Sequence, residues 1–271
     1  MESKRRRMIG SMMGAIFVAV VLFTAPARAP AQDSATVDLE LVLAVDSSGS
    51  IDDDEAHLQR GGWASAITHP RAVGAIRSGR HGAVAVMFLE WASVGCETIS
   101  VNWMRISDAA SAQAFANAIM AAPRVHCPGG NAIGDAVAFA AQQIHANTYR
   151  GERRVIDVSG DGPNTRGRPV EPIRDAVVAS GITINGLALL RRRAFYGPFD
   201  EYYRVSVIGG PGAFVITADK ETEFRQAVLA KLVREIAGID TDSRAATLTP
   251  APAPPGHADR REGVRPGGPL P

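Results

Sequence analysis

Residues 37–50, VDLELVLAVDSSGS, contain the pattern that decides the fold. The first part is predominantly apolar, which is typical of a strand buried on both faces of a parallel sheet. The strand ends at Asp46, and turn-forming residues follow it directly. An acidic cluster, Asp52–Glu55, then begins a helical pattern that runs to Ile67. The negative charge of this cluster is favourable at a helix N-terminus. This stretch predicts a strand, a polar loop and a helix in succession.

The rest of the chain continues this alternation of strands and helices. A short connection around residues 93–96 joins the second and third strands and predicts a hairpin. The pattern predicts an α/β fold with a doubly wound, mostly parallel six-stranded sheet, helices on both faces and one antiparallel edge strand. Beyond the opening stretch, strands are predicted at 83–91, 98–106, 153–159, 182–189 and 213–217, and helices at 108–121, 132–146, 170–180 and 221–237.

Both ends of the chain differ in composition from its middle. Residues 1–31 have a basic start, an apolar stretch and then small residues, which is the order of a secretory signal peptide. The apolar stretch is shorter than the roughly 20 residues that a membrane-spanning helix needs. Residues 242–271 are rich in proline and contain no aromatic residue, which predicts a disordered tail. We therefore expect one domain, residues 32–241, that is periplasmic or secreted, without stable membrane insertion.

The charge balance argues against nucleic acid as a partner. The whole chain has 29 Lys and Arg residues and 28 Asp and Glu residues, a net charge of +1. The excess of basic residues lies in the two terminal segments, so the domain between them has a net negative charge. A general binder of phosphate backbones has the opposite sign.

Polar residues gather where the predicted strands end. Asp46, Ser48 and Ser50 follow the first strand, Asp161 follows the strand predicted at 153–159, and Asn131 opens a helix. Ligands of open α/β sheets bind at the carboxyl ends of the strands. Two carboxylates together with hydroxyl and amide oxygens suit a hard divalent cation. No Cys or His lies within these clusters, which favours Mg²⁺ over zinc, with Mn²⁺ or Ca²⁺ as alternatives.

These residues resemble the metal-ion-dependent adhesion site of von Willebrand factor type A domains. The D-x-S-x-S run at 46–50 is similar to the first motif of that family, and the Asp-Gly at 161–162 is similar to its third. Stretches such as RRVIDVSGDGPNT at 153–165 and GITINGLAL at 181–189 resemble a bacterial exported subfamily of this fold, classed as a domain of unknown function. The resemblance covers most of the predicted domain and implies the same α/β fold.

The resemblance also implies roles for the site residues. Ser48 and Ser50 would bind the metal directly, and Asp46 and Asp161 would bind it directly or through water. Asn131 stands where the family usually has a Thr, and it is open whether this residue is a ligand or caps the following helix.

The third motif departs from the family pattern. Gly160 separates Ser159 from Asp161, whereas the family has Ser or Thr directly before the Asp. Asp157 is therefore a competing candidate, ranked below Asp161 because it lies in the middle of the predicted strand.

The two cysteines are expected to form a disulfide. An exported chain with two cysteines usually pairs them. In the fold that the resemblance implies, Cys96 and Cys127 both lie on the metal face. We expect the bond to preorganise the segment that contains Asn131.

A segment rich in arginine and tyrosine follows the strand predicted at 182–189. These residue types are enriched in protein interfaces. The segment is interpreted either as the rim of a partner-binding surface or as a loop whose aromatic residues pack onto the sheet. Its candidate contact residues are Arg191, Arg192, Arg193, Tyr196, Phe199 and Tyr202.

Together these features favour a non-enzymatic exported domain whose metal accepts an acidic residue of a protein partner. A metal-dependent phosphatase-like hydrolase is one alternative, because residues 160–164 resemble the GDGxN element of haloacid-dehalogenase phosphatases. Position 48 is Ser where those enzymes have an acidic residue, and no Lys lies between Asp46 and Asp161. The general acid and the phosphate-neutralising Lys are therefore missing. A structural domain of this fold that binds no metal is the other alternative.

Overall fold

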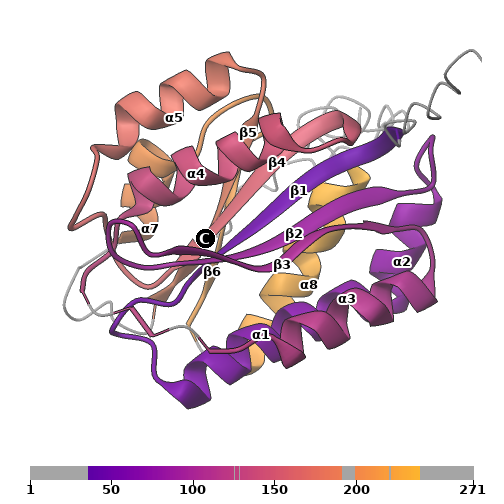
Figure 1. The fold of residues 1–271 in the computed structure, drawn as a ribbon, viewed down its shortest axis with the longest axis horizontal. Coiled ribbons are helices and arrows are strands. Elements are labelled where there is room, and N and C mark those ends of the chain that lie inside the picture. Colours follow the sequence, from indigo (N-terminus) through magenta and orange to yellow (C-terminus); the bar gives the residue numbers. More distant parts are fainter. Residues whose placement is uncertain (1–35, 125, 128, 191–198, 220, 239–271) are drawn as a thin grey trace, which may run out of the picture. The chain divides into compact units, whose positions relative to one another are not determined.

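A six-stranded sheet forms the centre of the domain (Figure 1). The computed structural model describes residues 36–124, 126–127, 129–190, 199–219 and 221–238. The strand order is β3-β2-β1-β4-β5-β6. Every neighbouring pair is parallel except the β2–β3 hairpin at one edge, which is antiparallel. The predicted α/β fold with one antiparallel edge strand is confirmed, and the expected signal peptide and Pro-rich tail lie outside the described residues.

The two central strands, β1 and β4, are the longest, and β1 is buried from its second residue to its end. Burial on both faces explains why the first strand is mostly apolar along its whole length. β4 begins three residues before its predicted start, and β6 is shorter than predicted. The strands are β1 Thr36–Asp46, β2 Val84–Trp91, β3 Glu97–Ile106, β4 Arg150–Gly160, β5 Thr183–Leu189 and β6 Val215–Ala218.

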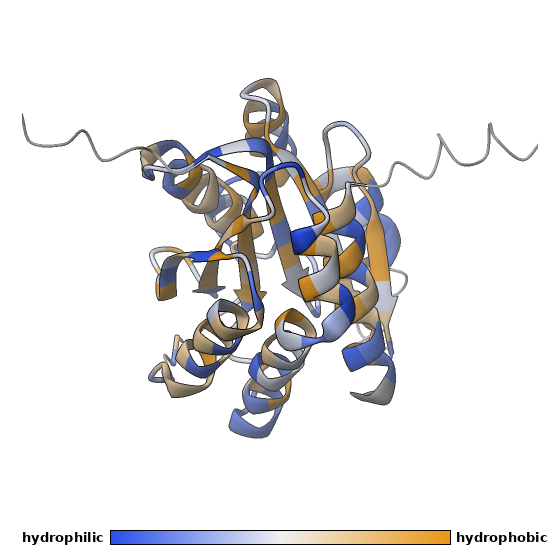
Figure 2. Cartoon of the chain, turned by 90° about the vertical axis from the view of Figure 1, so that its right-hand side faces the viewer, coloured by the Kyte–Doolittle hydropathy of each residue, from blue (hydrophilic) through white to orange (hydrophobic). Residues whose placement is uncertain are grey.

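Helices cover both faces of the sheet, and the apolar residues lie between the layers (Figure 2). One face is covered by α1 (Asp53–Thr68), α2 (Pro70–Arg77), α3 (Ala109–Ala121) and α8 (Glu221–Ala237). The other is covered by α4 (Ile133–Ala146), α5 (Val170–Ala179), α7 (Phe199–Tyr202) and the π-helical turn η2 (Tyr203–Val207). In the described part of the chain, none of the helices combines the length and the apolar character needed to cross a membrane.

The helix α2 is not among the helices predicted from the sequence. His69 ends α1 and caps α2, since its side chain accepts a hydrogen bond from the backbone N–H of Arg71. Pro70 stands in the first turn of α2, where its missing N–H costs no hydrogen bond. The break between the two helices therefore follows from two adjacent residues.

A buried charged network attaches α8 to the sheet. The side chain of Lys231 is fully buried, and its Nζ lies 2.9 Å from Asp157 Oδ1 on β4. The same ammonium group donates to Glu235 Oε1, which also accepts a hydrogen bond of 2.9 Å from Asn185 on β5. Burial, followed by repulsion from Glu235, raises the pKa of Asp157 to about 8 although Lys231 acts against the shift. The ammonium group is thus shared by two buried carboxyl groups.

We expect the substitution Lys231→Met to destabilise the domain by about 3 to 5 kcal/mol, because it leaves two buried carboxyl groups without their cation. Urea unfolding of the wild type and the variant measures the loss. Arg80→Met is the matched control, since Arg80 pairs with Glu152 at the surface, and exposed pairs contribute little. Equal losses in the two variants would contradict the structural importance of the buried network.

Candidate metal centre

The carboxyl ends of β1 and β4 form the middle of the candidate site. The strands pair in parallel with Val45 opposite Ser159, so Asp46 and Asp161 lie at the same edge of the sheet. Both residues are only 2% exposed, and the backbone N–H of Asp161 donates to Asp46 Oδ2 over 3.5 Å. The strand order reverses between β1 and β4. This reversal point is where open α/β sheets bind ligands.

The loop between β1 and α1 brings two serine hydroxyls to these carboxylates. The backbone N–H of Ser48 donates to Asp46 Oδ1 over 2.8 Å, a local turn that orients the carboxylate. Ser48 Oγ and Ser50 Oγ lie 2.9 Å apart, and Ser50 Oγ donates to Asp161 Oδ1 over 3.2 Å. Four of the five residues predicted as metal ligands therefore form one connected cluster.

The electrostatics of this cluster suit a cation. Burial, followed by repulsion from Asp161, raises the pKa of Asp46 to about 7. Within the described residues, Asp46 has polar contacts with Ser48 and Asp161 and forms no ion pair with Lys, Arg or His. Two like charges close together in a buried place repel each other strongly. A divalent cation bound between them would offset this repulsion, so the residues present fit a hard metal ion.

Asn131, the fifth predicted ligand, lies in the segment next to this loop and is 6% exposed. Its backbone N–H donates to Thr165 Oγ1 over 3.0 Å, and its carbonyl oxygen accepts from the N–H of Thr165 over 2.8 Å. A Cβ added to Gly49 would lie 3.5 Å from the carbonyl oxygen of Gly129, so the two segments touch. The N-cap of α4 is Ala132, without a side-chain cap bond, so the interpretation of Asn131 as the N-cap is wrong.

Asn164, in the loop that follows Asp161, was not among the residues predicted for this site. Asn164 Oδ1 accepts a hydrogen bond of 3.3 Å from the N–H of Gly134, in the first turn of α4. In the same region Asp135 accepts hydrogen bonds from the backbone and the guanidinium group of Arg168. These contacts attach the loop after β4 to the start of α4. The GDGxN pattern was visible in the sequence, but it indicated a catalytic element instead of this connection.

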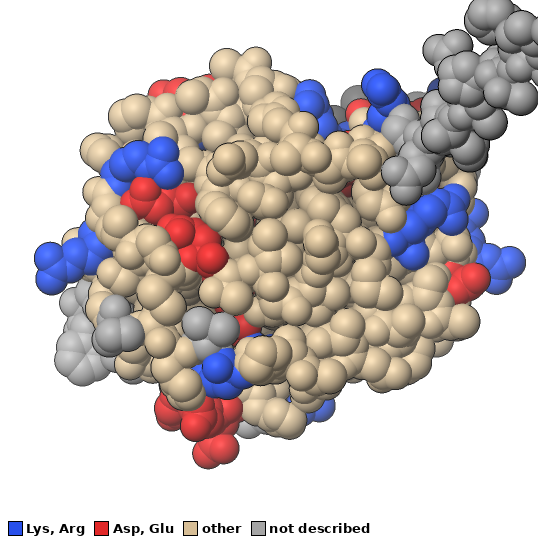
Figure 3. Space-filling model, viewed as in Figure 1, with Lys and Arg blue, Asp and Glu red and all other residues tan. Residues whose placement is uncertain are grey.

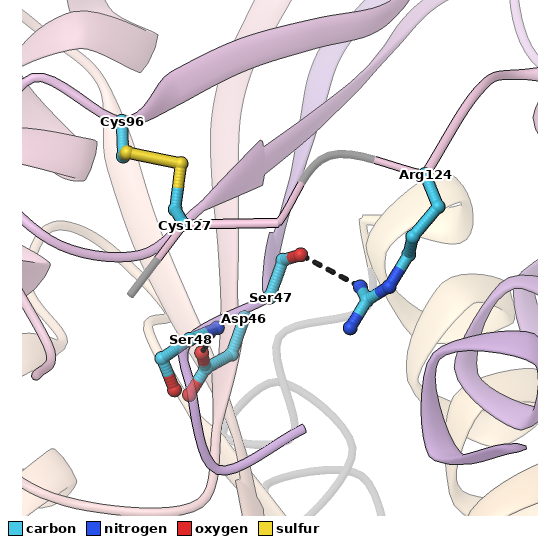
Figure 4. The surroundings of a disulfide bond; sticks show 6 residues. All are labelled: Asp46, Ser47, Ser48, Cys96, Arg124 and Cys127. Atoms are coloured by element: carbon cyan, nitrogen blue, oxygen red, sulfur yellow. Dashed lines mark hydrogen bonds between the residues drawn. A yellow bond between two sulfur atoms is a disulfide. The ribbon is translucent and has the colours of Figure 1, made fainter. Parts of the chain in front are cut away.

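A disulfide between Cys96 and Cys127 braces the other side of the site (Figure 4). The expected bond is present, and it joins the β2–β3 hairpin to the segment before Asn131. Arg124, from the same segment, donates to Ser47 Oγ and to the carbonyl oxygen of Ile51, each over 2.8 Å. This segment is therefore attached both to the hairpin and to the loop that contains Ser48 and Ser50.

The aromatic segment predicted as a partner-binding surface is described only in part. Phe199 is 2% exposed and packs edge-on against Tyr203, so it belongs to the core and does not face a partner. Tyr202 is half-buried, and its hydroxyl accepts a hydrogen bond of 3.3 Å from the N–H of Asn164, which places it beside the loop after Asp161. The four other predicted contact residues, Arg191, Arg192, Arg193 and Tyr196, lie outside the described residues.

A second group with possible metal ligands lies at the opposite end of β1. It consists of Asp38, His81 and Glu152. Asp38 accepts hydrogen bonds from the backbone N–H groups of His81 and Ala83, while His81 and Arg80 both contact Glu152 Oε1. These contacts hold the turn before β2, and the group is separate from the candidate metal centre.

Solved structures with this fold include several von Willebrand factor type A domains, as the resemblance implied. The pilus adhesin SpaC from Lactobacillus rhamnosus GG has a TM-score of 0.55 at 16% identity, covering 74% of this chain and 31% of that one. Proximal thread matrix protein 1 from the mussel byssus has a TM-score of 0.53 at 12% identity, and the match covers 75% of this chain and 48% of that one. A von Willebrand factor type A protein from Catenulispora acidiphila has a TM-score of 0.48 at 15% identity, and the match covers 74% of this chain and 43% of that one.

The chain spans less than half the length of each of these proteins, and the likeness concerns the fold alone. No curated protein matches the sequence. The family described as "Protein of unknown function (DUF1194)" matches residues 36–240, which is most of the chain and all of the sheet. The chain thus belongs to the DUF1194 family and has the fold of a von Willebrand factor type A domain.

Proposed function

We propose that this domain binds a divalent cation and, through it, an acidic residue of a protein partner. Asp46, Ser48, Ser50 and Asp161 would hold the cation, with the amide oxygen of Asn131 as a further ligand. The observation that carries this proposal is the pair of buried carboxylates, Asp46 and Asp161, joined by two serine hydroxyls at the reversal point of the sheet.

The ligand chemistry favours Mg²⁺, with Mn²⁺ or Ca²⁺ as alternatives. Every donor in the set is an oxygen, and hard cations prefer oxygen ligands. Mg²⁺ also keeps several water molecules when it binds to a protein, so it leaves positions for a ligand from outside. When bound, the cation supplies a Lewis-acidic position that a carboxylate oxygen of the partner can occupy.

The surroundings of the cluster leave one side open to a partner. Gly49 is exposed and Ser50 is half-buried, so the tip of the loop reaches solvent. Acidic side chains gather near the start of α1, where Asp52, Asp53 and Asp54 are exposed (Figure 3). These charges oppose the approach of an acidic partner, and a bound cation would offset part of this repulsion. They favour a partner segment that has a basic residue next to its carboxylate.

The names of two structurally similar proteins agree with this function. One is a pilus adhesin and another is a thread matrix protein, so both names describe proteins of attachment or matrix. The predicted signal peptide adds that this domain acts outside the cytoplasm, in the periplasm or after secretion. We propose a binding domain of adhesion or scaffold type without enzymatic activity.

Calorimetric titration of the cation-free protein with Mg²⁺ and Mn²⁺ should show saturable binding to one site. Asp46→Ala should abolish the binding, because it removes one of the two carboxylates that balance the charge of the cation. Asp54→Ala is the matched control, since this exposed residue of α1 lies outside the cluster and its loss should leave the affinity unchanged. Absence of binding by the wild type, or equal binding by Asp46→Ala, would contradict the proposal.

Cation binding should weaken at acidic pH. Burial and the charge of Asp161 raise the pKa of Asp46 to about 7, so below this pH the cation must displace a proton from Asp46. For one displaced proton the affinity should fall about tenfold per pH unit below 7 and level off above pH 8. Titrations between pH 5.5 and pH 8.5 measure the slope. An affinity independent of pH over this range would show that Asp46 does not bind the cation as a carboxylate.

Removal of the disulfide should loosen the site. The double substitution Cys96→Ser and Cys127→Ser should lower the free energy of unfolding by roughly 3 kcal/mol, because it frees a closed loop in the unfolded chain. It should also weaken cation binding several-fold, since the segment with Arg124 and Asn131 loses one attachment. Thiol titration of the unreduced wild type is the control, and reactive thiols there would contradict the bond.

A further inference from the structure

The π-helical turn η2 brings a tyrosine from a distant part of the sequence to the candidate metal centre. Tyr203 is the first residue of η2 and directly follows α7. Its side chain is fully buried, and its ring packs edge-on against those of Phe199 and Tyr202, with centroid distances of 6.1 and 6.3 Å. Single π-helical turns are rare and frequently occur at functional sites.

The hydroxyl of Tyr203 is buried and has no hydrogen-bond partner among the described residues. Buried tyrosine hydroxyls usually find a partner, because an unsatisfied polar group in the interior costs free energy. The packing of the ring therefore accounts for the position of Tyr203 but not for its hydroxyl.

Gly160, which has no side chain, lies beside this hydroxyl and shows where it points. A Cβ added to Gly160 would lie 2.6 Å from Tyr203 Oη and 3.1 Å from Asp46 Oδ2. It would also lie 3.3 Å from the ring of Trp91, so no larger residue fits. The hydroxyl and the carboxylate of Asp46 thus border the same small gap. The glycine between Ser159 and Asp161, a departure from the family pattern, keeps this gap open.

The phenol beside the carboxylates remains a hydrogen-bond donor. Burial, followed by the negative charges of Asp46 and Asp161, raises the pKa of Tyr203 well above its ordinary value. The hydroxyl therefore keeps its proton throughout the neutral pH range. A donor that keeps its proton, next to a buried carboxylate, favours the charged form of that carboxylate when the two are hydrogen-bonded.

We propose that Tyr203 is a positioning residue of the cation site, its hydroxyl donating a hydrogen bond across the gap at Gly160, through one water, to Asp46 Oδ2. This inference rests on the proposed function. The bond holds Asp46 in the orientation in which its other oxygen is available to the cation. Groups that hydrogen-bond to metal ligands in this way orient them and tune their affinity for the metal.

The substitution Tyr203→Phe tests this role, because it removes the hydroxyl and keeps the ring. We expect the affinity for Mg²⁺ and Mn²⁺ to fall about 10- to 100-fold, the usual effect of losing a partner of a metal ligand. The urea midpoint of the cation-free protein should stay unchanged or rise, because an unsatisfied buried hydroxyl is removed. A merely structural role would lower this midpoint and leave the affinity unaltered.

Tyr149→Phe is the matched control, since Tyr149 lies at the opposite end of the sheet, against Trp103. Its affinity for the two cations should equal that of the wild type. Wild-type affinity in Tyr203→Phe would overturn the proposal. Failure of the wild type to bind either cation would overturn the proposed function and the positioning role together.

A pair of substitutions tests the geometry without any cation. Gly160→Ala places a methyl group against Tyr203 Oη and should destabilise the cation-free protein. The same change should cost less in the Tyr203→Phe background, because the nearest of the clashing atoms is gone. Equal costs in the two backgrounds would show that the hydroxyl does not occupy the gap beside Asp46, and this would overturn the proposal whatever the cation titrations show.

Discussion

Two carboxylates buried side by side are the constraint on which the rest of the site depends. The parallel pairing of β1 and β4 places Asp46 and Asp161 at one edge of the sheet, where both are almost completely removed from water. Lost hydration and repulsion from Asp161 oppose this arrangement and raise the pKa of Asp46. The surrounding loops must therefore hold the two carboxylates against their mutual repulsion.

Three sets of contacts hold the two carboxylates in place, and each set involves a different loop. Ser48 and Ser50 bond within the β1–α1 loop and to Asp161. Arg124 and the disulfide attach the segment before α4 to that loop and to the hairpin. Asn164 joins the loop after β4 to the first turn of α4. A site fixed from three sides before any ligand arrives loses little conformational entropy on binding.

The parts that the sequence predicted are those whose signals are local. Apolar runs and turn residues indicate strands and their ends, and the D-x-S-x-S spacing places Asp46, Ser48 and Ser50 on one loop. Tyr203 gave no such signal, and the pattern that contains Asn164 indicated a catalytic element. The groups that these two residues face, Asp46 and Gly134, are distant in the sequence, and only the packed fold brings them together. α2 was missed for another reason: it begins at Pro70, directly after the end of α1, where a proline also fits the end of the preceding helix.

Two acidic residues, Asp157 in β4 and Asp161 just after it, have different surroundings. The side chains of β4 alternate between the two faces, and Asp157 points to the face covered by α8, where Lys231 Nζ lies 2.9 Å from Asp157 Oδ1. Asp157 was the competing candidate for the third ligand, and its pairing with Lys231 leaves it little reason to bind a metal. Asp161, four residues later, lies beside Asp46, and its backbone N–H donates to Asp46 Oδ2 over 3.5 Å. The fold thus pairs one buried carboxyl group with a lysine and places another beside a second carboxyl group, and the proposed cation would offset the repulsion between these two.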